Sequence, residues 1–161
     1  MKWITRRRPK IDRVACPWLI ARFIDTQPEF LFVAPEHVLR DAAEQSAIPF
    51  DVDGVELSHD GPACSFDAFL AKYSLAGDPA LQRIATIVRG ADTARLDLAP
   101  QAAGLLAISL GLSVMFDDDL VQLEHGFVMY DALYAWCQHA ADETHTWNPQ
   151  SRVPPIGATE A

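Results

Sequence analysis

Apolar residues recur at two different spacings along the chain, and the change of spacing separates a β-containing third from a helical remainder. Short apolar runs at residues 3–5 and 30–33 predict two strands. Between them, residues 11–25 carry apolar side chains at a mostly helical spacing, with Pro17 near the start. Proline is favoured in the first turn of a helix, so Pro35 predicts the start of a second helix that runs to about Gln45.

Residues 48–58 predict a β-hairpin. They read Ile-Pro-Phe-Asp-Val-Asp-Gly-Val-Glu-Leu-Ser, which places Asp53 and Gly54 between two alternating runs. An Asp-Gly pair in that position is a strong short-range signal for a two-residue hairpin turn. Together with the two strands, this segment predicts a small N-terminal β-sheet with a hairpin.

From Cys64 onward the pattern is helical. It predicts helices over about residues 65–73, 78–90, 100–115 and from the acidic run 117–119 to about His139. The helix over 100–115 is apolar nearly all round, which predicts that it is the central, buried helix. In the last helix, Asp117, Glu124 and Asp131 form a stripe that we expect to face solvent. The fold class is therefore α+β, with the small sheet packed against a mainly helical C-terminal two-thirds.

With 161 residues, half of them hydrophobic, the chain fits one domain, which we place at residues 1–141. Residues 142–161 are polar and proline-bearing, and we expect a loosely ordered tail. No apolar run approaches the roughly 20 residues needed to cross a bilayer, and the N-terminus lacks a signal-peptide pattern. Three dispersed cysteines also suit a reducing compartment. We therefore expect a cytoplasmic protein without a membrane partner.

The net charge of -9 argues against a nucleic-acid partner, because binding to phosphate backbones relies on clustered Lys and Arg. The charge is uneven, however. Residues 1–22 hold seven basic side chains and one acidic residue, Asp12. This end either docks on the acidic body of the protein or forms an anion site. A homodimer is a further expectation.

The first candidate site is the start of the helix over residues 11–25. If Asp12 caps this helix, Arg13 and Cys16 lie in its first turn, where free N–H groups favour negative charge. Cys16 would then be partly ionised and suited to catalysis. The same end would bind an oxyanion through Arg13, with Arg22 and Arg7 adding positive charge. The alternative is that Cys16 is a small core residue.

The second candidate is the segment from Glu56 to Asp67. Glu56, His59, Cys64 and Asp67 all carry ligand atoms for a transition metal such as zinc or iron, and Cys64 is a second candidate catalytic thiol. The spacing matches no recognised zinc motif. In the alternative interpretation, Asp67 caps a helix, His59 bonds to a loop carbonyl and Cys64 is buried.

The third candidate is Asp92, which follows the helix-breaking Gly90. It is a possible metal ligand or general base, whereas a surface ion pair with Arg89 is the ordinary explanation. The sequence contains no nucleophile elbow, P-loop or dinucleotide fingerprint, so we expect no nucleotide cofactor.

Five segments carry a family resemblance: PKIDRVACPWLIARFID, FLFV, IPFDVDGVELSHDGPACSFD, IVRGADT and YDALYAWC. In this order and with these gaps they resemble the C-terminal domain of ChrB-type chromate-resistance proteins, from about Trp3 to Cys137. Arg89 stands where the family pattern leads us to expect His. The resemblance implies a chromate-resistance context and does not supply a reaction.

Two classes of function remain. In the preferred one, the domain binds or senses a chromate-like oxyanion or a transition metal ion, with a small inorganic ion as its partner. In the other, it is a metal- or thiol-dependent redox enzyme in chromate detoxification, so its status as an enzyme is open. A third interpretation is an interaction module whose acidic helical face docks a partner.

Overall fold

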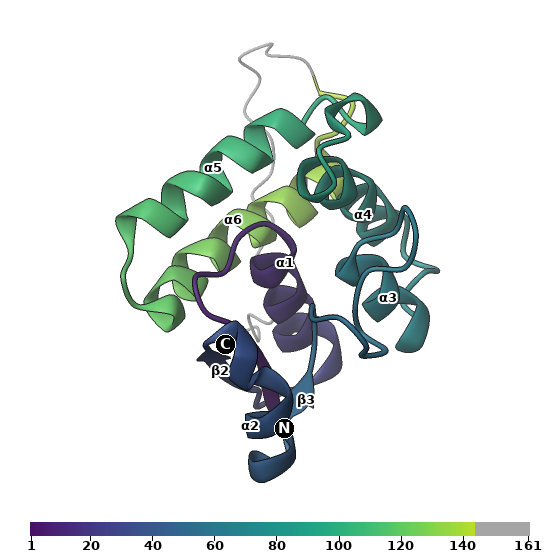
Figure 1. Cartoon of the computed structure of the whole chain (residues 1–161). Helices are drawn as coiled ribbons and strands as arrows, with labels where there is room; N and C mark the ends of the chain where they lie inside the picture. The colour runs from purple at the N-terminus through teal and green to yellow at the C-terminus, as the bar shows by residue number, and fades with distance from the viewer. Residues whose placement is uncertain (144–161) are drawn as a thin grey trace, which may run out of the picture.

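The computed structural model describes residues 1–143, and its elements follow the predicted order (Figure 1). The strands are β1 (Lys2–Arg6), β2 (Glu29–Val33) and β3 (Ile48–Pro49). The α-helices within these residues are α1 (Asp12–Leu19), α2 (Val38–Gln45), α3 (Ser65–Lys72), α4 (Pro79–Asp92), α5 (Ala102–Met115) and α6 (Asp119–His139). A π-helical turn, Ile20–Ile24, extends α1, and short 3-10 turns at Pro35–His37 and Leu96–Leu98 precede α2 and α5. The α+β class is confirmed.

The sheet has the strand order β2-β1-β3, and both pairings are parallel. Side chains of β1 alternate between two clusters, as expected for a strand covered on both faces. Trp3 belongs to the main core, whereas Ile4 packs with Val38 and Ala42 of α2. The sheet therefore ties α2 to the rest of the domain.

The hairpin predicted over residues 48–58 is wrong. The turn itself forms, with Gly54 at a φ of 82° and the Asp51 N–H donating to the Leu57 carbonyl at 2.8 Å. The flanking segments do not continue as a ladder, because β3 pairs with β1 and the Asp51 side chain is bonded to Arg6. The segment is a closed loop that carries acidic side chains.

Helix α1 occupies the centre of the domain, between the sheet on one side and α3, α4 and α6 on the other (Figure 1). Its side chains are buried almost throughout. Aromatic residues contribute the bulkiest side chains of the surrounding core, among smaller aliphatic ones. The largest fully buried side chains include Trp3, Trp18, Tyr130, Phe50, Phe66 and Phe69.

Helix α5 is not the central helix, so that prediction is wrong. It packs against α4 and α6 through Ala102 and Leu105, while Val114 is 80% and Met115 71% exposed. The sequence of a helix that is apolar all round does not indicate which of its faces is buried. Helix α1 already fills the centre of the domain. Helix α5 therefore forms an outer layer. No helix in the described part of the chain has the length and apolar character to span a membrane.

Helix α6 fastens the segment that leads into α1. The Tyr130 hydroxyl donates to the Ile11 carbonyl at 3.2 Å, and the Gln122 amide donates to the Pro9 carbonyl at 2.7 Å. At Gly126 the two helices are so close that a Cβ atom would lie 2.4 Å from Cγ1 of Val14. The loose tail predicted over residues 142–161 falls mainly on residues 144–161, which lie outside the described residues.

Candidate metal site

Three segments that are distant in sequence converge beside the start of α1. They contribute Asp12 from the first residue of α1, His59 from the loop before α3 and Asp92 from the last residue of α4. Nε2 of His59 lies 3.2 Å from Oδ2 of Asp12 and 3.1 Å from Oδ2 of Asp92. One ligand atom from each residue lies within 4.8 Å of the other two. We refer to Asp12, His59 and Asp92 as the Asp–His cluster.

Asp12 enters the cluster because of an unusual backbone at Ile11. Ile11 is the N-cap of α1 and has φ 43° and ψ -103°, a strained conformation for a β-branched residue. Among residues 1–143, no side chain caps α1, and its N-cap residue is Ile11, so the prediction that Asp12 is the cap is wrong. Instead, Oδ2 of Asp12 accepts the Ser65 N–H at 3.3 Å, at the start of α3. The bond from Tyr130 to the Ile11 carbonyl helps to hold this strained entry.

Asp51 is a fourth carboxylate next to the Asp–His cluster. Its Oδ1 accepts the Ser65 hydroxyl at 2.9 Å and lies 3.4 Å from Nε2 of His59. Its Oδ2 lies 2.6 Å from Arg6 and 3.1 Å from Arg13. With these partners, Asp51 is largely satisfied. We therefore regard it as an anchor for the cluster and not as a free ligand.

Burial and mutual charge alter the protonation of the cluster. Its hydrogen bond to Asp12 raises the pKa of His59 to about 9. Burial, together with the Asp12 charge, raises the pKa of Asp92 to about 7. Burial also raises the pKa of Asp51. Near neutral pH the His59 imidazolium therefore lies among carboxylates. The same carboxylates could balance the charge of a metal cation in its place.

These shifts predict that the metal-free domain loses stability as the pH rises from 6 to 9. Both His59 and Asp92 bind protons more tightly when folded, so their contribution is present at low pH and disappears as the pH passes about 7 and then about 9. Because His59 is 40% exposed, solvent screening reduces the effect, and we expect the Tm to fall by about 5 °C. Thermal unfolding in chelator would measure this. His59→Gln should flatten the fall above pH 6.5, and a Tm that rises with pH would contradict the assignment.

Both candidate thiols are buried, and the expectation of an ionised Cys16 is wrong. Burial, reinforced by the Asp12 charge, raises the pKa of Cys16 and of Cys64. The two thiols are close enough for ionised Cys64 to raise the pKa of Cys16 as well. A catalytic role for either thiol stays a prediction, and it would require a group that removes the thiol proton.

Two further predicted ligands do not belong to the Asp–His cluster. Glu56 is 71% exposed and pairs with Lys72. Cys64 is the N-cap residue of α3, with Sγ 3.5 Å from Oδ2 of Asp67. Asp67 also accepts the Cys64 N–H at 2.9 Å, which confirms that it caps the helix.

Arg89 does not form the predicted ion pair with Asp92. Its guanidinium bonds to both carboxylate oxygens of Asp67, at 2.9 and 2.6 Å. Because Arg89 pairs with Asp67, the ion-pair partner of Asp92 is His59 of the Asp–His cluster.

The predicted anion-binding arginines lie in different surroundings. Arg13 is beside the cluster, but it contacts Asp51 and donates to the carbonyls of Arg6 and Arg7 at 3.1 and 3.2 Å. Arg7 is exposed. Arg22 bonds twice to Asp131 of α6, at 2.9 and 2.8 Å.

Asp131 also accepts the Trp18 indole N–H at 2.8 Å, so its predicted position on a solvent-facing stripe is wrong. The arginines therefore do not form a single anion site.

Sequence reasoning identified His59 and Asp92 as candidate ligands and missed Asp12 and Asp51. Asp12 was assigned to a helix cap, although a single acid among seven bases in residues 1–22 is a signal in itself. Asp51 was assigned to a strand of the hairpin. No local pattern indicates that its side chain is bonded to Arg6 and Ser65.

Fold and cluster together define a small α+β domain with a mixed imidazole–carboxylate site. The family model described as "ChrB, C-terminal domain" matches residues 3–137, and the chain belongs to this family, as the resemblance predicted. Protein ChrB of Cupriavidus metallidurans is 34% identical over 152 residues, covering 94% of this chain and 42% of that relative. The chain thus spans less than half the length of the curated relative. No solved structure matches it.

Proposed function

We propose that this domain acts in chromate resistance by binding a divalent transition metal ion at Asp12, His59 and Asp92. Membership of the ChrB C-terminal domain family supports the chromate-resistance role. The observation that supports a metal site is that three ligand atoms lie within 4.8 Å of one another. One imidazole and two carboxylates suit zinc or iron, since both metals accept nitrogen and oxygen ligands.

The charges favour a cation over an oxyanion at the cluster itself. A dianion such as chromate would be repelled by the carboxylates of Asp12, Asp92 and Asp51. Arg13, the nearest predicted anion-binding residue, is engaged by Asp51 and by two carbonyls. An oxyanion at this site would therefore need a bound metal ion to offset the carboxylates.

A redox enzyme is the second candidate, because the buried thiols of Cys16 and Cys64 lie close to Asp12. Their raised pKa values oppose direct nucleophilic chemistry near neutral pH. Metal binding without turnover is the simpler proposal.

Titration of metal-stripped protein with Zn²⁺ by calorimetry tests the proposal. We expect one ion per chain, and His59→Ala should weaken the affinity at least about tenfold. Glu56→Gln and Cys64→Ser are matched controls, since both residues were predicted as ligands but do not belong to the cluster, and each should change the affinity less than about twofold. No binding, or equal losses in the controls, would contradict the site.

A further inference from the structure

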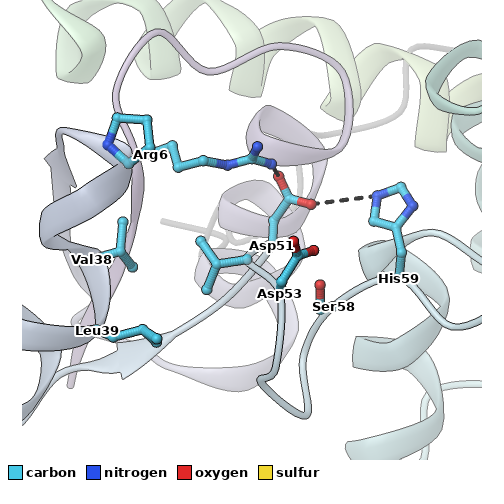
Figure 2. Close-up of a pocket in the computed structure, with 9 residues that line it drawn as sticks. Arg6, Val38, Leu39, Asp51, Asp53, Ser58 and His59 are labelled. Carbon is cyan, nitrogen blue, oxygen red and sulfur yellow. Dashed lines mark hydrogen bonds and ion pairs between the residues drawn. The ribbon is translucent and has the colours of Figure 1, made fainter.

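A pocket of about 370 Å³ opens beside the Asp–His cluster and shares His59 with it (Figure 2). Figure 2 shows Arg6, Asp51 and His59 in a row along one side, with Val38 and Leu39 of α2 on the other. The volume falls in the range of small-molecule sites. A polar wall thus faces an apolar one.

Arg6 has donors available on the polar wall. Its Nη2 donates to Oδ2 of Asp51 at 2.6 Å, and its side chain is 38% exposed. Within residues 1–143, its Nε has no hydrogen-bond partner but is buried, so the exposed end of the guanidinium is the part that a ligand could reach. Arg13 differs, because it is only 16% exposed and is held by Asp51 and two carbonyls. Arg6 is therefore the arginine that can receive an anionic group in this pocket.

A metal ion at the cluster would be open toward the same pocket. Asp12, His59 and Asp92 supply three protein ligands, and a metal site with three protein ligands keeps a position for water or substrate. Of these residues, His59 lines the pocket and is the most exposed, at 40% against 3% for Asp12 and 14% for Asp92. A ligand in the pocket would therefore approach such a metal ion past His59.

The apolar wall indicates that the ligand is organic. Val38 is fully buried beneath the pocket, and Leu39 is 56% exposed at its edge. An inorganic oxyanion would use Arg6 and the metal but would leave the exposed Leu39 side chain in contact with water. A ligand with a short aliphatic group would cover it.

We propose that this pocket binds a small organic carboxylate that bridges the metal ion and Arg6, with its aliphatic part against Leu39. The inference rests on the proposed metal site, because the metal and Arg6 together offset the negative charge of Asp51 and Asp53. It names the class of ligand that completes that site.

Protein loaded with Mn²⁺ tests the proposal, because this paramagnetic ion relaxes the protons of any ligand bound beside it. Electron spin resonance first measures Mn²⁺ binding. Proton relaxation then measures the binding of isovalerate and of acetate, and shows whether sulfate displaces isovalerate. We expect isovalerate to bind about tenfold more tightly than acetate, since it adds apolar area against Leu39. Its methyl protons should relax strongly.

Variants separate the two walls. Arg6→Gln should weaken both acids about tenfold while changing Mn²⁺ affinity less than threefold. Leu39→Ala should remove most of the preference for isovalerate. Arg40→Gln and Leu120→Ala are the controls and should change nothing. Leu120, at 52%, matches Leu39 in exposure, and Arg40, at 58%, is a more exposed arginine than Arg6.

Equal binding of acetate and isovalerate, displacement of isovalerate by sulfate at equal concentration, or absent relaxation with Mn²⁺ bound would each overturn the organic-carboxylate assignment. Failure of Mn²⁺ to bind, together with no Zn²⁺ binding in the calorimetric titration, would instead overturn the proposed function, and this inference with it. Metal binding, which is measured first, distinguishes failure of the proposed function from failure of the carboxylate assignment.

Discussion

Replacing Asp12 by asparagine is expected to weaken Zn²⁺ binding at least about 100-fold while leaving the domain folded. The change removes one of three ligands and one negative charge from a side chain that is only 3% exposed. Asparagine keeps the size of aspartate and an oxygen that can accept the Ser65 N–H. The pKa of His59 should also fall from about 9 toward its ordinary value, because the bond to Asp12 is its largest cause.

Calorimetry would measure the affinity, and NMR titration of the His59 ring would measure its pKa. The matched control is Asp97→Asn, since Asp97 is 67% exposed and pairs with Arg95 at the surface. This control should alter neither quantity. An Asp12→Asn protein that binds Zn²⁺ like the wild type would exclude Asp12 as a ligand.

Gly126→Ala is expected to destabilise the domain by about 2 kcal/mol. Alanine favours helices over glycine by about 1 kcal/mol, so the exchange would normally stabilise α6. Here the new methyl group would lie 2.4 Å from Cγ1 of Val14, and α1 and α6 would have to separate. Such overpacking costs about 1–3 kcal/mol, and more where the backbone must shift. Urea unfolding would measure the change.

Gly104→Ala provides the matched control, because a Cβ atom there meets nothing within 4 Å. It should raise the free energy of unfolding by up to about 1 kcal/mol. Gly126→Ala should cost less stability in a Val14→Ala background than in the wild type, because Val14→Ala removes the contacting methyl groups. Stabilisation by Gly126→Ala alone would show that α1 and α6 are not in close contact.

Elements with local signals could be predicted from the sequence. Asp78 caps α4 by accepting the N–H groups of Ala80 and Leu81, and Asp118 does the same for α6 at Leu120 and Val121. These signals depend on neighbours within three residues, so they are visible in the chain itself. The strand at residues 30–33 and the helix starting at Pro35 are of the same kind.

Features set by distant contacts could not be predicted. The position of α5 depends on α1 filling the centre, and the loop at Asp51 depends on Arg6. The helix start favours a partly ionised Cys16, but Cys16 is the fifth residue of α1, and burial and the Asp12 charge raise its pKa. His59 and Asp92 were each plausible as ligands, yet their approach to Asp12 follows only from the packing of α1, α3 and α4.

The bonds from α6 to Pro9 and Ile11 have a consequence for protein synthesis. The strained entry to α1 is held by Gln122 and Tyr130, which leave the ribosome more than 110 residues later. At about 5–20 residues per second, this delay is about 6–24 s. During that time the nascent chain exposes Asp12 without the contacts that orient it. An ion at the proposed site would then bind after α6 has been synthesised and packed against α1.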